Sequence, residues 1–168
     1  KEYAEAVKRA GFDLVTLANN HILDQGISGL YHTLDDLDEV GLPHVGAYRN
    51  EEEKSSVIIV EVKGKVIAIL AYTYYCNYYE TEFFFKPENK HLTNFIVSPQ
   101  SPYINETIDA VKKDFEKAKN LSPDLIVVLP HMGDQFKHYP DDFQKYWCNK
   151  FVEFGADIVF SDHPHADD

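Results

Sequence analysis

The sequence predicts an α/β domain, and three observations carry this prediction. First, short apolar segments alternate with segments whose apolar residues recur every three or four positions, as strands alternate with helices in α/β proteins. Second, residues 125–129 form a continuous apolar run, which is typical of a strand covered on both faces. Third, two β-rich segments are joined by residues 63–65, whose composition is typical of a hairpin turn. We therefore expect residues 1–168 to form a single domain around a largely buried sheet.

The N-terminal part of the chain predicts two helices around one strand. Residues 1–10 carry apolar side chains at helical spacing, and residues 12–17 form a short apolar strand. Ser28 is expected to cap a second helix over residues 29–40, which Gly41 ends. The remaining predicted elements, in order, are hairpin strands over 56–62 and 65–73, an irregular aromatic stretch over 74–104, a helix over 105–120 capped by Asn105, a strand over 125–129, a helix over 141–154 that ends at Gly155, and a buried strand over 157–160.

Composition and charge bear on the partners and the extent of the chain. The net charge is −12 and the pI about 5.0, so we expect no nucleic-acid partner, because phosphate backbones require basic patches. No apolar run approaches the length that a membrane-spanning helix needs, so any membrane attachment is expected through a segment that this chain lacks. Because the chain opens at Lys1 and stops just after a histidine motif, we expect it to be part of a longer protein.

Polar residues with metal-binding chemistry follow three of the predicted strands. The strand over 12–17 runs into Asn19, Asn20 and His21, the strand over 125–129 runs into His131, and the last strand runs into a His-Pro-His motif at 163–165. In α/β sheets the loops beyond the carboxyl ends of strands meet at one rim. Imidazole nitrogens and amide or carboxylate oxygens suit zinc, iron, manganese or nickel. The sequence therefore predicts a shared metal site at this rim.

Each of these residues also has an ordinary structural explanation. A single histidine after a strand is more often a hydrogen-bonded loop residue, and an asparagine there can simply adopt turn geometry. Asp24 lies one helical turn beyond His21, where it either orients the imidazole ring or serves as a plain helix-start or turn aspartate. The coincidence of all three motifs at successive strand ends favours the metal site.

These motifs resemble a known family. The segment 11–50, which contains ANNHILD, strongly resembles the signature block of bacterial capsule and poly-γ-glutamate synthesis proteins, the CapA/PgsA-like family. The segments VIAILAYT, DLIVVLPHMGDQF and FGADIVFSDHPH fit the same family in the same order, so the resemblance covers nearly the whole chain. Residues 74–104 show no correspondence. The family is itself similar to the calcineurin-like metallophosphoesterases, which implies a β-sandwich flanked by helices, with four αββα layers.

The resemblance implies roles for individual residues. Asn20, His131, His163 and His165 match metal ligands of a site with two divalent ions of the Mn, Fe or Zn type, and His21 matches a general acid that Asp24 would orient. The sequence departs from the family at Gln135, where a carboxylate is usual. The strands that supply the bridging carboxylate would precede Lys1, so we expect the fold to be incomplete at both ends and to hold part of the dinuclear site.

Two functions follow as expectations. The first is a metal-dependent hydrolase-like domain in capsule or poly-γ-glutamate biosynthesis, which acts on a phosphoester or an amide link of an anionic polymer. The alternative is a catalytically inactive scaffold that binds or exports the polymer, or binds other capsule-synthesis proteins. A serine or cysteine hydrolase is disfavoured, because no G-x-S-x-G motif occurs and neither Cys76 nor Cys148 lies beside a histidine. The family implies an extracytoplasmic, membrane-anchored or cell-surface location in a bacterium.

Overall fold

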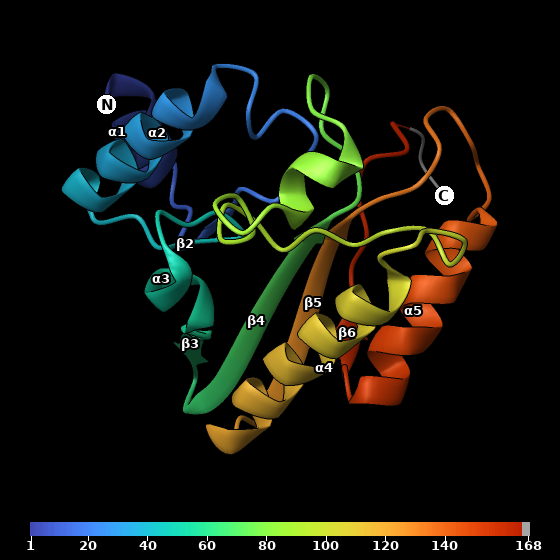
Figure 1. Cartoon of the computed structure of the whole chain (residues 1–168). Helices are drawn as coiled ribbons and strands as arrows, with labels where there is room; N and C mark the ends of the chain where they lie inside the picture. Colours follow the sequence, from blue (N-terminus) through green and yellow to red (C-terminus); the bar gives the residue numbers. More distant parts are fainter. Residues whose placement is uncertain (166–168) are drawn as a thin grey trace.

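The computed structural model describes residues 1–165, which form two sheets and their flanking helices (Figure 1). The strands are β1 (Val15–Thr16), β2 (His44–Val45), β3 (Ile58–Val62), β4 (Lys65–Thr73), β5 (Leu125–His131) and β6 (Ile158–Val159). The α-helices are α1 (Glu2–Arg9), α2 (Gly26–Val40), α3 (Glu51–Ser55), α4 (Ile104–Asn120) and α5 (Asp142–Phe154), and η1 (Thr81–Phe85) is a short 3₁₀ helix. Among these residues, no helix has the length and apolarity needed to cross a membrane.

The larger sheet has the strand order β3-β4-β5-β6, and the smaller one pairs β1 with β2. The β3–β4 pair is antiparallel, whereas the β4–β5, β5–β6 and β1–β2 pairs are parallel. Lys63 and Gly64 join β3 to β4 with φ angles of 51° and 75°, and positive values at both central residues are the backbone of a two-residue hairpin turn. The predicted hairpin is therefore confirmed.

The apolar clusters define four layers. On one face of the larger sheet, side chains of β4 and β5 pack with α4 and α5, and Phe115, Trp147 and Phe151 are completely buried there. On the other face, Ala18 and Val45 of the smaller sheet region pack against Ala71 of β4. The cluster of Ala4, Leu37 and Leu42 joins α1 and α2 to the outer side of the smaller sheet. In Figure 1, α1 and α2 lie together away from α4 and α5, which run alongside the larger sheet. The predicted α/β fold with flanking helices is confirmed.

Two predicted helix caps are wrong. The segment 21–26 makes successive turns, in which Gly26 N–H donates to Leu23 O at 2.8 Å, and these turns run directly into α2. As a result Gln25 is the N-cap and Ser28 lies inside the helix. Similarly, a turn closed by Ile104 N–H on Ser101 O at 3.2 Å leads into α4 and makes Tyr103 its N-cap instead of Asn105. The helix ends at Gly41 and Gly155 are confirmed, and both glycines adopt left-handed φ angles, of 66° and 108°.

The structure also shortens two predicted strands. The strand over 12–17 is reduced to Val15–Thr16, because β2 offers it only two partner residues. The strand over 157–160 is reduced to Ile158–Val159, and its description as buried is wrong. Within the described residues β6 pairs on one side only, and Ile158 keeps 47% of its surface exposed. The prediction for residues 125–129 is confirmed, since Ile126 and Leu129 of β5 pack against opposite layers.

Candidate functional site

The backbone brings the predicted motifs to one rim of the larger sheet. Beyond the end of β6, Asp162 pairs with His131 at the end of β5 in a parallel bridge. Met132 N–H donates to Asp162 O at 3.0 Å, and Asp162 N–H donates to Pro130 O at 3.2 Å. The segment after β1 reaches the same place, because the Asn20 side chain contacts His131. This convergence at the carboxyl ends of strands is the one predicted from the sequence.

Asn20 and His131 form the centre of the rim. Asn20 is buried, with 4% of its surface exposed, and its Oδ1 lies 2.9 Å from His131 Nε2. The other ring nitrogen, Nδ1, lies 2.9 Å from Asp162 Oδ1. A carboxylate behind a histidine holds the ring in place and raises its basicity, as it does in many metal sites. Asp162 is therefore the orienting partner of His131.

The His163 ring packs behind that of His131 at an interplanar angle of 60°, with 4.6 Å between the ring centroids. Its Nδ1 donates to Gly133 O at 2.7 Å, which leaves the lone pair on Nε2 to accept from Gln135 Nε2 at 3.1 Å. Burial lowers the pKa of His163, so the neutral ring is favoured. A neutral imidazole whose Nδ1–H is held by a carbonyl is the form that binds a metal through Nε2.

The backbone around this histidine needs unusual conformations. Gly133 has a φ angle of 111°, and a Cβ there would lie 2.5 Å from the Gln144 side chain. His163 itself has a φ angle of 107°, which is rare for a residue with a side chain. Strain of this kind persists only where the surroundings enforce it, and it concentrates at functional sites. Asp141 N-caps α5 through a capping box and also accepts from Asp134 N–H at 2.7 Å, so it anchors the loop after Gly133.

His21 and Asp24 form the second pair at the rim. The Nδ1 atom of His21 lies 2.7 Å from Asp24 Oδ2, and the His21 side chain is largely exposed. Asn19 Oδ1 accepts from His21 N–H at 2.9 Å, which is a local bond of the kind that an asparagine in a turn makes. Asp24 also lies in a turn, where its N–H donates to His21 O at 3.1 Å, so both explanations given for Asp24 agree with this geometry.

A cleft of about 330 Å³ lies in front of these side chains and is lined by Asn20, His21, His131, Asp162 and His165, with Thr16, Ala18 and Asn19. The His165 ring centroid lies 5.7 Å from that of His163. The structure therefore brings all six predicted site residues together: five of them around the cleft or directly behind it, and Asp24 behind His21.

The residues fit a metal in part. Adjacent ligand atoms bound to one ion at about 2.1 Å are about 3 Å apart at right angles, and the 2.9 Å between Asn20 Oδ1 and His131 Nε2 fits this spacing as it fits a hydrogen bond. Within residues 1–165, however, no three His, Cys, Asp or Glu side chains gather in a metal-ready group. Gln135, at the position of the family carboxylate, instead contacts His163 Nε2. The ligand assignments stay predictions.

Two residues of this site escaped the sequence interpretation. Asp162 directly precedes the His-Pro-His motif, so its position beside the candidate ligands was a usable signal. Asn77 comes from the irregular stretch that shows no correspondence to the family, and nothing in the sequence marks it. Its side chain contacts Asn20 and Asp24, with distances of 2.9 Å and 3.2 Å.

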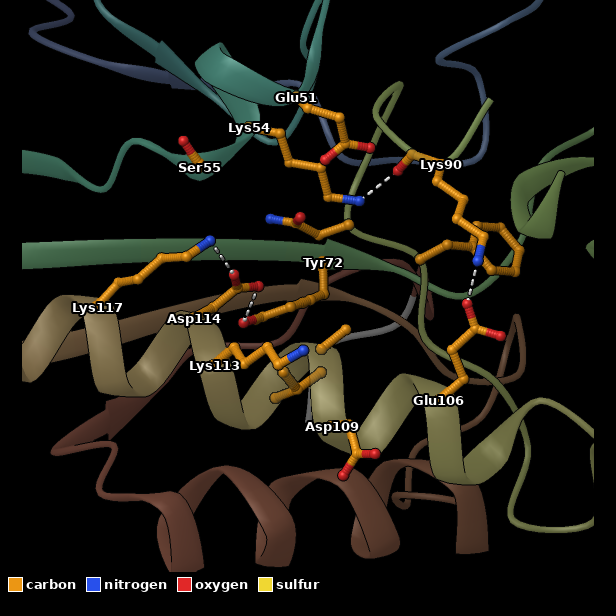
Figure 2. Close-up of a pocket in the computed structure, with 14 residues that line it drawn as sticks. Glu51, Lys54, Ser55, Tyr72, Lys90, Glu106, Asp109, Lys113, Asp114 and Lys117 are labelled. Atoms are coloured by element: carbon orange, nitrogen blue, oxygen red, sulfur yellow. Dashed lines mark hydrogen bonds and ion pairs between the residues drawn. The ribbon is translucent and has the colours of Figure 1, made fainter. Parts of the chain in front are cut away.

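A larger hollow of about 650 Å³ lies elsewhere, between α3 and α4 (Figure 2). Several of its charged side chains pair with one another: Lys90 pairs with Glu106, and Asp114 accepts from Tyr72 Oη at 3.3 Å and from Lys117 at 3.5 Å. Burial raises the pKa of the Asp114 carboxyl. None of the predicted site residues lines this hollow. The smaller cleft is the candidate site, because only there do the rim histidines meet.

Two facing sheets between flanking helices are the architecture of a metallophosphoesterase-like α/β fold. The chain belongs to the family of bacterial capsule synthesis proteins, PGA_cap, whose model matches residues 1–166. This confirms the predicted family.

Two similar proteins are named for the biosynthesis of capsule or PGA. The chain is 30% identical to the capsule biosynthesis protein CapA of Bacillus anthracis over 99% of its own length, and 28% identical to the PGA biosynthesis protein CapA of Bacillus subtilis, also over 99%. It spans 38% and 40% of the lengths of these two relatives.

Proposed function

We propose that this chain is the metal-dependent, hydrolase-like part of a protein of capsule or poly-γ-glutamate biosynthesis. One observation carries the proposal. Asn20 Oδ1 and His131 Nε2 converge at the spacing of two ligand atoms, and the His21–Asp24 pair lies on the same cleft. Family membership and the names of the two Bacillus relatives support the biosynthetic context.

In this proposal Asn20, His131, His163 and His165 hold divalent ions of the Mn, Fe or Zn type. The bound ions supply Lewis acidity and an activated water. Asp24 Oδ2 accepts a hydrogen bond from His21 Nδ1–H, so His21 acts as an acid in its imidazolium form: Nε2–H gives its proton to the leaving group, and the ring returns to the neutral Nδ1–H tautomer. Asp162 keeps His131 in its ligating orientation.

The substrate class in this proposal is an anionic polymer of the cell envelope. Both a phosphoester and an amide present an oxyanion in the transition state, so the same cleft serves either bond. The relatives are named for capsule and PGA biosynthesis, which supports a cell-envelope context, and we propose an extracytoplasmic location with any membrane contact made by another part of the protein.

A second candidate is a scaffold without turnover, which binds polymer or other capsule-synthesis proteins. The contact between Gln135 and His163 Nε2 favours it, because an amide occupies the lone pair that a metal would need.

Metal content and hydrolysis separate the two candidates. The hydrolase predicts about one or more equivalents of bound Mn²⁺ and Mn²⁺-dependent cleavage of a generic phosphodiester or a γ-glutamyl amide. His131→Ala should then abolish binding of at least one ion, and His21→Ala should reduce turnover while metal stays bound. The exposed His32, on α2, provides the matched control for His→Ala. Retention of metal and full activity in both cleft variants would contradict the assignment, and absence of both in the wild type would favour the scaffold.

A further inference from the structure

Asn77 ties together the two halves of the candidate site. It lies partly buried in the loop after β4, and its backbone N–H donates to Asn20 O at 2.9 Å. Its side chain reaches both Asn20 and the His21–Asp24 pair. The loop therefore contacts the segment 20–24 through main chain and side chain together.

The first side-chain contact orients Asn20. Asn77 Oδ1 accepts from Asn20 Nδ2 at 2.9 Å. A carboxamide binds a metal through its oxygen, so its NH₂ group needs an acceptor elsewhere if the oxygen is to point at the ion. With the Asn20 amide nitrogen held by Asn77, Oδ1 is turned towards His131 Nε2.

The second contact orients Asp24. Asn77 Nδ2 lies 3.2 Å from Asp24 Oδ1 and 2.9 Å from His21 Nδ1. His21 Nδ1 is only 2.7 Å from Asp24 Oδ2, and a lone pair facing a carboxylate at that distance would be repelled, so Nδ1 carries the proton. The amide of Asn77 then donates to the free oxygen of Asp24 and not to His21 Nδ1, so each carboxylate oxygen has its own donor.

We propose that Asn77 is a positioning residue that couples the metal-facing amide of Asn20 to the acid pair His21–Asp24. The catalytic role of Asn77 in this inference rests on the proposed function, whereas the hydrogen bonds that couple Asn20 to the His21–Asp24 pair do not depend on it. The Asn77 side chain accepts from Asn20, which faces the metal site, and donates to Asp24, which belongs to the acid pair. Substitutions of Asn77 can therefore separate the two effects.

Two variants test the coupling. Asn77→Ala removes both bonds, so we expect Mn²⁺ affinity to fall at least tenfold and turnover to fall further. Asn77→Asp keeps the acceptor for Asn20 and replaces the donor facing Asp24 with an oxygen. It should leave the Mn²⁺ dissociation constant within about threefold of wild type and lower kcat at least tenfold, with little change in KM.

The matched control is Asn89→Ala. Asn89 lies in the same irregular stretch, is buried, and donates to Phe83 O at 3.0 Å. It should cost stability without weakening Mn²⁺ binding. Equal effects of Asn77→Ala and Asn89→Ala on thermal stability, with Mn²⁺ affinity unchanged in both, would overturn the inference and reduce Asn77 to a loop anchor.

A readout without metal keeps this test separate from the test of function. In metal-free wild type, ¹⁵N NMR should show His21 as the Nδ1–H tautomer, and Asn77→Ala should shift the Asn20 side-chain amide signals while Asn89→Ala leaves them in place. If the wild type binds no Mn²⁺ but these signals behave as described, the proposed function fails and the coupling holds. An Nε2–H tautomer of His21, or unmoved Asn20 signals, would refute the coupling whether or not metal binds.

Discussion

Asn20 Oδ1 and His131 Nε2 lie 2.9 Å apart although 111 residues separate them in the chain. The contact exists because β1 belongs to the smaller sheet, which packs on β4, while His131 ends β5, the neighbour of β4. The candidate site thus forms at the junction of the two sheets, and its properties depend on side chains that hold each partner from behind.

Asp162→Asn should weaken Mn²⁺ binding about tenfold or more with little loss of stability. The carboxylate holds His131 Nδ1, but its own side chain is 62% exposed, and asparagine keeps an oxygen that can accept from this nitrogen, so little stability is lost. Mn²⁺ titration and thermal unfolding measure the two effects. Asp13→Asn, at an exposed position outside the cleft, is the control. Equal affinities of the two variants would contradict the orienting assignment of Asp162.

Gly133→Ala should lower the free energy of unfolding by about 2 kcal/mol or more, since it combines a left-handed backbone with a clash against Gln144. Gly64→Ala is the matched control: φ is 75° there and no atom lies within 4 Å of an added Cβ, so only the cost of about 1 kcal/mol for the backbone applies. Urea denaturation of both variants compares them. A loss at Gly133 no greater than at Gly64 would show that Gln144 moves aside freely.

Asp141→Ala should destabilise the protein by about 1–2 kcal/mol, because it removes the N-cap of α5. The carboxylate accepts from Gln144 N–H and Asp134 N–H, both at 2.7 Å. Asn50→Ala removes the comparable cap of the short helix α3, whose residues are not in the buried core, and should cost less. Hydrogen exchange should also speed up over residues 133–141 in the Asp141 variant only, and unchanged exchange there would contradict the anchoring of this loop.

Asp114→Asn should change how stability depends on pH. Burial raises the folded-state pKa of this carboxyl above its ordinary value of 3.8, so the folded protein holds this proton more tightly than the unfolded chain. The resulting stabilisation is complete below pH 3.8 and is lost as pH rises through the higher folded-state pKa. The variant has no such proton, so the difference in Tm between variant and wild type should move in favour of the variant as pH rises from 3 to 7.

The control for the pH dependence of Asp114→Asn is Asp109→Asn, on the exposed side of α4, the helix that also carries Asp114. Its Tm should follow the wild type in parallel over the pH range. A constant difference between Asp114→Asn and wild type at every pH would show that the Lys117 and Tyr72 contacts offset the burial of Asp114.

The sequence predicted helix and strand ends correctly where residues close along the chain determine them. Gly41 and Gly155 end their helices because only a residue without Cβ easily takes the left-handed angle required there. The caps at Ser28 and Asn105 were wrong because preceding turns extended the helices backwards, and that extension depends on the hydrogen bonds of residues 21–26 and 101–104. The buried strand predicted over 157–160 was wrong because burial of a strand depends on its neighbours, and the described residues give β6 only one.

From the sequence alone we could predict the α/β class, the family, and the rim residues Asn20, His21, His131, His163 and His165. These features are carried by residue type and spacing along the chain. The partner that holds each side chain depends on the folded structure: Asp162 holds His131, Gly133 O holds His163 and Asn77 holds Asn20. Hydrogen bonds act over about 3 Å in space whatever the separation in sequence, so an unmarked asparagine 57 residues away becomes a partner only when the loop after β4 is folded against the rim.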